Sequence, residues 1–258
     1  MREILPEIVK LDLRRLKLND MAAHLDEALH LAAETREGHL AFLADLVKKQ
    51  VEATGARSLE RRIKKAGFPQ RLTFESFDWG FQPGLNIEYI KDLTHLDFVE
   101  KRQPLLILGK TGTGKTHLAT AFGIRACEAR YRVAFFRVQD LLLRLHTALS
   151  QNTAYEIISG LARLHVLILD ALGYVRPKPE YPSLLFDVIN ACHGRVALII
   201  TSSVSFEEWG QNMGNPSIVN AIVDRLLDRA CLINIRPGRS YRTDGPLAPK
   251  LTSDSPEH

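Results

Sequence analysis

The stretch LLILGKTGTGKTHLATAFG, residues 105–123, decides the fold of this chain. A short apolar run leads directly into Gly109, and Gly114, Lys115 and Thr116 follow after four further residues. This spacing, between a predicted strand and a predicted helix, is the signature of a phosphate-binding loop. We predict that the loop binds a nucleotide through nine residues: Gly109, Lys110, Thr111, Gly112, Thr113, Gly114, Lys115, Thr116 and His117.

The residue types of this loop suit phosphate binding. Glycines let consecutive backbone N–H groups converge on phosphate oxygens, and the N-terminus of the following helix adds partial positive charge. Lys115 reaches the terminal phosphates, and the hydroxyl of Thr116 is a ligand for Mg²⁺. A glycine-rich turn can arise by chance, but an intact GKT between a strand and a helix argues against that alternative.

An acidic residue suited to the metal ends another apolar run. The run HVLILD, residues 165–170, ends in Asp170, and open α/β sheets bind ligands at the carboxyl ends of their strands. We therefore predict Thr116 and Asp170 as the Mg²⁺ ligands. The alternative is an aspartate that only caps the turn after the strand. The next residue, Ala171, carries only a methyl group.

Five short apolar runs indicate the architecture: residues 105–109, 133–138, 165–170, 196–201 and 231–235. Runs that are apolar throughout, without alternation of polar and apolar residues, are typical of strands covered on both faces. We predict an α/β fold, a P-loop ATPase core with a five-stranded parallel sheet between layers of helices. The run at 133–138, between the loop and Asp170, fits P-loop ATPases that have an additional strand there.

The sequence predicts four segments. Residues 1–69 form a small all-helical domain, because apolar residues recur there at helical spacing, with separate helices on either side of Gly55. Asn19 and Asp20 are capping candidates for an earlier helix. Residues 70–103 form an ordered, aromatic connector arm, residues 104–242 form the nucleotide-binding domain, and residues 243–258 form a flexible polar tail.

Composition excludes several classes of protein. The 258 residues are 45% hydrophobic and 25% charged, and no apolar run approaches the roughly 20 residues that cross a bilayer. The N-terminus lacks the pattern of an export signal, and three widely separated cysteines suit neither a disulfide framework nor a zinc site. We expect a soluble, cytoplasmic protein without a membrane partner. A net charge of +4 permits an anionic partner but does not require one.

A cationic stripe lies on the last predicted helix of the first domain. Arg57, Arg61, Lys64 and Lys65 recur at i, i+4, i+7 and i+8, against the single acid Glu60. Such a stripe is either a solvated face or a contact to a phosphate backbone. No base-reading helix is evident, so we expect little sequence preference if the stripe binds DNA.

Two later positions also leave alternatives open. Polar side chains end the run at 196–201 and follow it, at Thr201, Ser202 and Ser203, and at that edge they could orient the attacking water opposite the γ-phosphate. Ser203 could equally be the N-cap of the next helix. Arg225 and Arg229 lie one helical turn apart. Arginine suits stabilisation of a leaving phosphate, usually from a neighbouring subunit, but an arginine beside Asp224 or Asp228 also suits a surface charge lattice.

The chain resembles the IstB-like family of AAA+ ATPases, the transposition helper proteins of bacterial insertion sequences and kin of the DnaC-type helicase loaders. The resemblance rests on the stretches GKTGTGKTHLATAFGIRACEARYRVAFFRVQDLLLRL, LILDALGYV, LIITSSVSFEEWG, DRLLD and GRSYR. The earlier stretches LERRIKKAGFP and LTFESFDWGFQPGLN are similar to that family's leading domain and connector. The resemblance covers nearly the whole chain.

The resemblance implies an ATP-dependent regulator that oligomerises on duplex DNA, deforms it, and recruits and stimulates a transposase. By this resemblance, residues 109–116 are the Walker A loop, Asp170 is the Walker B acid and Ser203 is the sensor-1 residue. Arg225 is by the same resemblance an arginine that acts in trans, at nucleotide sites between subunits. The implied cofactors are ATP and Mg²⁺. The implied DNA-contact candidates are Arg57, Arg61, Arg62, Lys64 and Lys65.

Two positions depart from the family pattern. Ala171 stands where the family has the glutamate that polarises the attacking water, and Ser203 stands where it has asparagine. Phosphate binding depends on the loop and Lys115 and does not need the missing glutamate. Loss of a positioned base, in contrast, lowers the rate of hydrolysis by a factor of about 10² to 10⁴. We therefore expect an ATP-binding protein with much reduced turnover.

Three other functions are alternatives to this one. A replicative helicase loader has the same fold but acts on a helicase and prefers single strands. A hydrolysis-deficient, nucleotide-bound scaffold is compatible with Ala171. A small-molecule kinase would need an arginine-rich lid and an acceptor pocket, and the chain has a helical leader and a DRL segment instead.

Overall fold

The structure is a computed structural model that describes residues 4–36, 38–173, 178–235 and 238–241. It contains two compact units, Met1–Arg61 and Arg62–His258, and the boundary between them falls inside helix α3 (His39–Ala66). The predicted tail, residues 243–258, lies outside the described residues.

The second unit contains a five-stranded sheet in the order β2-β3-β4-β1-β5. All four neighbouring pairs are parallel, which confirms the predicted sheet. The order places β4 between the strand that enters the phosphate-binding loop and the strand that carries Asp170. The strands are β1 (Leu105–Gly109), β2 (Val133–Arg137), β3 (Val166–Leu172), β4 (Ala197–Ser202) and β5 (Cys231–Ile235).

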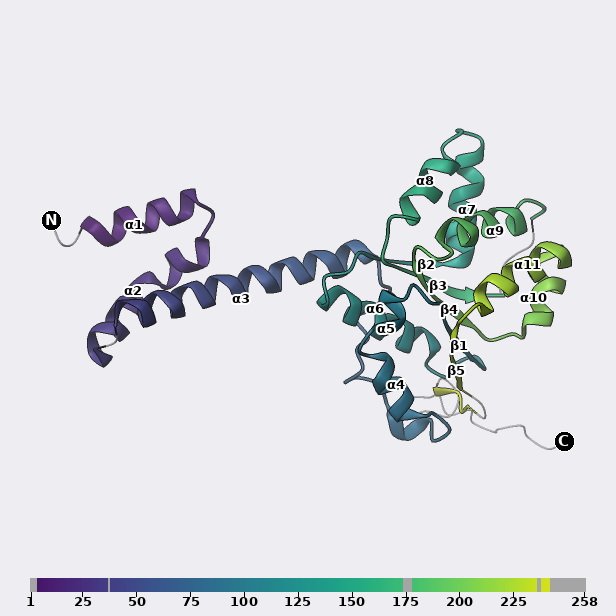
Figure 1. Cartoon of the computed structure of the whole chain (residues 1–258), viewed down its shortest axis with the longest axis horizontal. Coiled ribbons are helices and arrows are strands. Elements are labelled where there is room, and N and C mark those ends of the chain that lie inside the picture. Colours follow the sequence, from purple (N-terminus) through teal and green to yellow (C-terminus); the bar gives the residue numbers. More distant parts are fainter. Residues whose placement is uncertain (1–3, 37, 174–177, 236–237, 242–258) are drawn as a thin grey trace, which may run out of the picture. The chain divides into compact units, whose positions relative to one another are not determined.

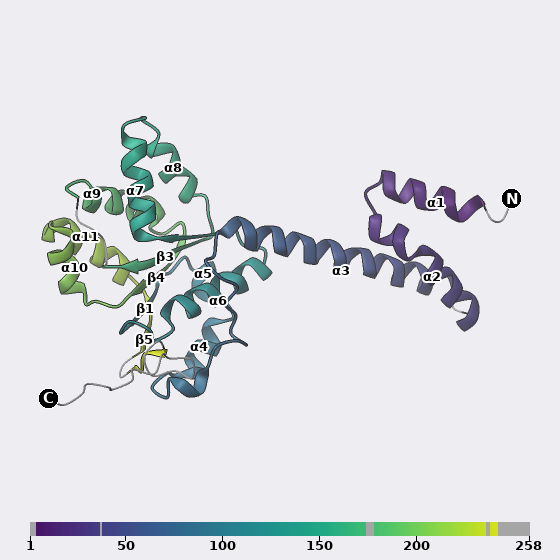
Figure 2. The same ribbon diagram turned by 180° about the vertical axis from the view of Figure 1, so that it is seen from behind.

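Helices cover both faces of this sheet, as Figures 1 and 2 show. One face carries α4 (Ile87–Leu93), α5 (Asp97–Glu100) and α6 (Lys115–Glu128). The other face carries α7 (Val138–Leu149), α8 (Ala154–Leu161), α9 (Tyr181–Cys192), α10 (Phe206–Met213) and α11 (Pro216–Leu227). Within the described residues, no helix combines the length and the apolar character that a membrane crossing requires.

Close packing fixes the position of α6, the helix that follows the phosphate-binding loop. At Gly123, in the middle of α6, an added Cβ would lie 2.7 Å from Cδ1 of Ile168 in β3 and 2.6 Å from the ring of Phe68. The Phe68 ring also packs edge-on against Phe135 of β2, with 6.2 Å between ring centroids. A side chain at position 123 would push the helix away from the sheet, so the glycine sets how closely the helix approaches the strands.

The first unit is helical, with α1 (Ile4–Arg15), α2 (Asn19–Thr35) and the first part of α3. Met21, Leu25 and Ala28 of α2 pack against Leu46 of α3. The prediction of separate helices on either side of Gly55 is wrong, because α3 runs unbroken for 28 residues. One glycine in a helix costs only about 1 kcal/mol, which the rest of a long helix can offset.

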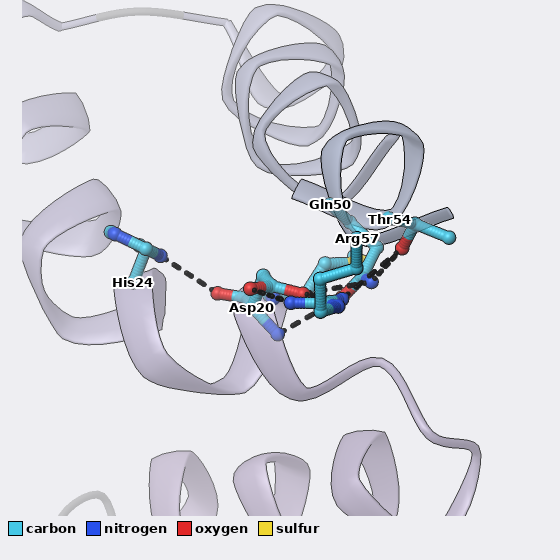
Figure 3. A network of polar contacts seen from close by, with 6 residues as sticks. Asp20, His24, Gln50, Thr54 and Arg57 are labelled. Carbon is cyan, nitrogen blue, oxygen red and sulfur yellow. Dashed lines mark hydrogen bonds and ion pairs between the residues drawn. The ribbon is translucent and has the colours of Figure 1, made fainter. Parts of the chain in front are cut away.

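A polar network joins the start of α2 to α3 (Figure 3). The N-cap position, Leu18, has no capping side chain, and Asn19 and Asp20 lie inside the helix. The buried Gln50 replaces the cap, since its Oε1 accepts from the N–H groups of Asp20 at 3.0 Å and Met21 at 3.2 Å. The amide of Gln50 also donates to Asp20 Oδ2 at 3.1 Å and to Thr54 Oγ1 at 2.7 Å.

The same aspartate pairs with an arginine one helix away. Arg57 donates to both carboxylate oxygens of Asp20, at 2.8 and 2.6 Å. This hydrogen-bonded guanidinium lowers the pKa of the Asp20 carboxyl. Gln50 and Arg57 therefore fix the register between α2 and α3 from two sides of one carboxylate.

Replacement of Gln50 by alanine should destabilise the first unit. The change leaves two N–H groups at the start of α2 without their acceptor, at a cost of about 1–3 kcal/mol. Urea unfolding followed by helical circular dichroism measures the loss. Gln151→Ala, at an exposed glutamine, is the control and should stay within about 0.5 kcal/mol. Equal stability of the two variants would contradict the capping role of Gln50.

Candidate functional site

The phosphate-binding loop lies between the end of β1 and the start of α6. Gly112 and Gly114 have φ angles of +81° and +91°, which favour glycine, and an added Cβ at Gly114 would lie 2.7 Å from the ring of Phe77. Lys115 is buried, and its Nζ donates to the carbonyl of Lys110 at 2.7 Å. The loop is thus closed on itself, with its lysine held inside the turn.

The predicted metal ligands lie together at the carboxyl edge of the sheet. Thr116 Oγ1 donates to Asp170 Oδ1 at 2.8 Å, and Asp170 is 5% exposed. A hydroxyl and a carboxylate are oxygen ligands of the kind that Mg²⁺ takes, together with waters and phosphate oxygens. Among the described residues, no group of three or more His, Cys, Asp or Glu side chains could hold a metal without such help. The pair therefore suits a metal that arrives with a phosphate ligand.

A third residue joins this cluster through a bond that was not predicted. Thr201, at the end of β4, is buried and donates to Asp170 Oδ1 at 2.7 Å. Its oxygen also accepts from the N–H of Ala171 at 2.9 Å. Thr201 thus holds both the carboxylate and the backbone that follows it. The sequence placed Thr201 at the sheet edge but offered no reason to pair it with Asp170.

The backbone at Ala171 is irregular. β3 continues past Asp170 to Leu172, with a shift of register against β4 between Leu169 and Leu172. Ala171 has a φ of +61°, in the left-handed region, which costs a residue with a Cβ about 1–2 kcal/mol. The bulge turns the half-buried methyl of Ala171 toward the same cavity that Asp170 lines.

An open cavity of about 750 Å³ lies beside the loop. Six of the nine predicted loop residues line it: Thr111, Gly112, Gly114, Lys115, Thr116 and His117. Residues near the carboxyl ends of β2, β3 and β4 line the other side: Arg137, Gln139, Asp170, Ala171, Thr201 and Ser203. The volume falls in the range of sites that enclose a whole small-molecule ligand.

Ser203 lies in the lining of this cavity and is half-buried. It does not cap the next helix, because the N-cap of α10 is Ser205, whose Oγ accepts from the N–H of Glu208 at 3.4 Å. The alternative of Ser203 as the N-cap is therefore wrong. Its predicted place near the terminal phosphate stays a prediction.

Arg225 lies away from the nucleotide cavity of its own chain. It lines a separate crevice with Pro104 and Leu198, near the amino ends of β1 and β4. Its guanidinium lies over the ring of Phe186 at 4.6 Å and donates to Asn190 Oδ1 at 3.2 Å. Arg225 therefore does not line the cavity beside the loop of its own chain, and its role towards a neighbouring subunit stays a prediction.

Arg229 is held differently from Arg225. Its NH2 group lies 3.6 Å from Asp228 Oδ2 in an exposed ion pair. Asp228 also lies within 3.7 Å of the ring nitrogen Nε2 of His193. The surface charge lattice that the sequence offered as an alternative therefore describes Arg229.

The five DNA-contact candidates differ in their surroundings. Arg57 pairs with Asp20, as described above. Arg62 is half-buried, and its Nε donates to the carbonyl of Cys127 at 2.8 Å, near the end of α6. Arg61, Lys64 and Lys65 are exposed on α3. The exposed three are the candidates whose charge is most accessible to a phosphate backbone.

Comparison with protein families gives a match over most of the chain. The family of IstB-like ATP-binding proteins matches residues 11–246. A protein of insertion sequence IS21 from Pseudomonas aeruginosa, named for ATP binding, is 35% identical over 89% of this chain and 86% of its own length. Its counterpart in insertion sequence IS232 from Bacillus thuringiensis subsp. berliner is 32% identical over 90% of this chain and 92% of its own.

Solved structures are similar in fold. The replication initiator DnaA, bound to AMPPCP and single-stranded DNA, has a TM-score of 0.56 and 22% identity over 68% of this chain and 53% of its own. The DnaC helicase loader has a TM-score of 0.52 and 21% identity over 68% of this chain and 99% of its own. These structural similarities confirm an AAA+ fold like that of DnaA and DnaC. The family itself is shown by the sequence comparisons. The chain belongs to the family of IstB-like ATP-binding proteins of insertion sequences.

Proposed function

We propose that this chain binds ATP with Mg²⁺ in the cavity beside the phosphate-binding loop and acts as an ATP-dependent, DNA-binding regulator of transposition. The observation that carries the nucleotide site is the hydrogen bond between Thr116 and Asp170, which joins the loop helix to β3 at 2.8 Å. Backbone N–H groups of the loop and Lys115 would bind the phosphates, and Thr116 and Asp170 would hold Mg²⁺, which would neutralise phosphate charge.

Hydrolysis in this proposal is slow. Among the described residues that line the cavity, Asp170 is the only carboxylate, and bound Mg²⁺ would engage it. Ala171, the next residue, presents a methyl group where a base would polarise the attacking water. Ser203, with its hydroxyl in the lining, orients that water but is a poor base at neutral pH. The protein therefore stays in its ATP-bound state for long periods.

Assembly and DNA binding complete the proposal. ATP at a subunit interface meets Arg225 of a neighbouring copy, after Arg225 leaves its contacts with Phe186 and Asn190. Arg61, Lys64 and Lys65 bind the backbone of duplex DNA, with little sequence preference. The ATP-bound oligomer deforms the DNA and recruits a transposase. The match to insertion-sequence proteins over nearly the whole chain supports this context.

A specific observation also favours a second candidate, a hydrolysis-deficient, nucleotide-bound scaffold, because Ala171 replaces the expected base. It differs from the first candidate in that ATP never needs to turn over. A helicase loader of the DnaC type has weaker support, since the likeness to DnaC, at 21% identity, reflects the fold alone.

Replacement of Ala171 by glutamate should raise the rate of ATP hydrolysis. A carboxylate restored beside Asp170 can polarise water, which is worth up to about 10² to 10⁴ in rate. Steady-state phosphate release measures the gain. Ala171→Gln, which has the same shape without a base, is the matched control for strain at the positive φ of this position. Equal rates in the two variants would mean that hydrolysis is limited elsewhere.

Removal of the exposed charges of α3 should weaken DNA binding. The triple variant Arg61→Gln, Lys64→Gln, Lys65→Gln loses up to three phosphate contacts. A plot of the logarithm of its DNA affinity against the logarithm of salt concentration should therefore have a slope that is smaller in magnitude by roughly 2–3. Mobility shifts of duplex and single-stranded DNA, with ATP, with ADP and without nucleotide, at two salt concentrations, measure it. Binding of duplex by the unaltered protein should require ATP.

The control for this experiment loses the same charge elsewhere on the surface. It carries three changes to glutamine, at Lys91, Lys101 and Arg130, which are exposed. This variant should bind DNA like the unaltered chain. Absence of DNA binding by the unaltered chain under every nucleotide condition would refute the proposed function, and an ATP-dependent preference for single strands would favour the helicase loader.

A further inference from the structure

The hydroxyl of Ser202, the last residue of β4, connects three segments near the nucleotide cavity. Ser202 is fully buried, and its Oγ lies 2.8 Å from the carbonyl oxygen of Leu172 and 3.0 Å from that of Val204. The same Oγ accepts from the N–H of Val204 at 3.3 Å and from Nε1–H of Trp209 at 3.0 Å. A hydroxyl has one hydrogen and two lone pairs, so these contacts use its whole bonding capacity.

Ser203, which lines the nucleotide cavity, lies between two residues that this hydroxyl joins. Because Ser202 Oγ contacts both the N–H and the carbonyl of Val204, it closes the turn around Ser203. The bond from Ser202 to Leu172 fixes the same turn to the bulge that carries Ala171. The orientation of Ser203 in the cavity lining therefore depends on the hydroxyl of Ser202.

The indole of Trp209 holds this hydroxyl from the side of α10. Trp209 is fully buried, and its ring packs edge to face on Phe206, with 4.9 Å between centroids. An added Cβ at Gly173 would lie 3.1 Å from Nε1 of Trp209, so the indole also lies against the chain just after the bulge. A buried indole N–H needs an acceptor, and Trp209 uses the hydroxyl that closes the turn at the cavity.

α10 packs in turn on α11, the helix that carries Arg225 (Figure 1). Trp209 belongs to the same core cluster as Val219 of α11. At Gly210 of α10, an added Cβ would lie 3.7 Å from Cα of Pro216, the first residue of α11. A displacement of the indole would therefore reach α11 through direct packing.

We propose that Ser202 and Trp209 position Ser203 at the terminal phosphate of a bound nucleoside triphosphate, and that the hydrogen bond of Trp209 responds to that phosphate. Neither residue lines the cavity, so both act through Ser203 as positioning residues. The inference rests on the proposed binding of ATP beside the loop, and it adds a connection from the terminal phosphate to α10 and α11. A nucleoside diphosphate lacks that phosphate and leaves the turn and the indole unchanged.

The first test compares ligands with and without the terminal phosphate. AMPPCP, an ATP analogue that is not cleaved between its last two phosphates, and ADP, each with Mg²⁺, are titrated by calorimetry. Ser202→Ala should weaken AMPPCP binding by the value of one hydrogen bond, about 2- to 13-fold, and change ADP binding less than twofold. Trp209→Phe, which keeps a ring but removes the donor, should do the same. The double variant should be no weaker than the weaker single variant, because both changes break one connection.

The control alters the same helix without touching this connection. Ser205 Oγ caps α10 by accepting from the N–H of Glu208 at 3.4 Å. Ser205→Ala removes that cap and should change the affinity for AMPPCP and for ADP by less than twofold. A loss of AMPPCP affinity in Ser205→Ala equal to that in Ser202→Ala would mean that the stability of α10 alone sets the affinity, and it would overturn the proposal.

Tryptophan fluorescence gives a readout that a purely structural role would not change. The chain has two tryptophans, Trp79 and Trp209, so Trp79→Phe leaves Trp209 as the only emitter. Its emission should shift on addition of AMPPCP but not of ADP, and Ser202→Ala in that background should abolish the shift. In Trp209→Phe, the remaining Trp79 should respond equally to both ligands.

The outcomes separate this inference from the proposed function. Equal emission changes with AMPPCP and ADP in Trp79→Phe, or no change with either, would overturn the inference, as would equal weakening of both ligands by Ser202→Ala. Failure of the unaltered protein to bind either ligand would instead refute the proposed nucleotide site itself.

Discussion

Oδ1 of Asp170 accepts hydrogen bonds from two hydroxyl groups, those of Thr116 and Thr201, and the geometry of the whole nucleotide site depends on this shared acceptor. Thr116 opens the helix after the loop, and Thr201 ends the strand that lies between β1 and β3. One carboxylate thus connects three elements at the carboxyl edge of the sheet. Because Asp170 is almost fully buried, an unpaired carboxylate there would be costly, so the two hydroxyl donors also stabilise the fold.

The residue after this carboxylate, Ala171, stands where a base for ATP hydrolysis is expected. Ala171 takes a left-handed conformation in a bulge, and its N–H is held by Thr201. Bulges next to active sites commonly re-aim a side chain, and this one aims position 171 into the cavity. The residue at this position carries only a methyl group, which lies in the cavity lining. We propose that this combination gives phosphate binding with slow hydrolysis, so that the protein acts in its ATP-bound state.

The sequence predicted the elements that local rules encode. Five apolar runs became five parallel strands, and the GKT spacing located Lys115 and Thr116, because strand, turn and helix are each fixed by neighbouring residues. It placed Thr201 at the sheet edge but missed its hydrogen bond to Asp170, because only the strand order brings the two residues together. It also missed Gln50 as a helix cap, because that contact joins residues 30 positions apart. Arg62 shows the same limit, since its bond to Cys127 joins residues 65 positions apart within the second unit.

The pairing of Thr116 with Asp170 as the magnesium side of an ATP site is the central claim, and the most direct test is the effect of Mg²⁺ on ATP affinity in Asp170→Asn. Asparagine keeps the size of the side chain and one acceptor oxygen but removes the charge that attracts the metal. Calorimetry with Mg²⁺ and with EDTA should show that the metal tightens ATP binding at least about tenfold in the unaltered protein, or about 1.4 kcal/mol, and has little effect in the variant. The same dependence on Mg²⁺ in both proteins would contradict this account.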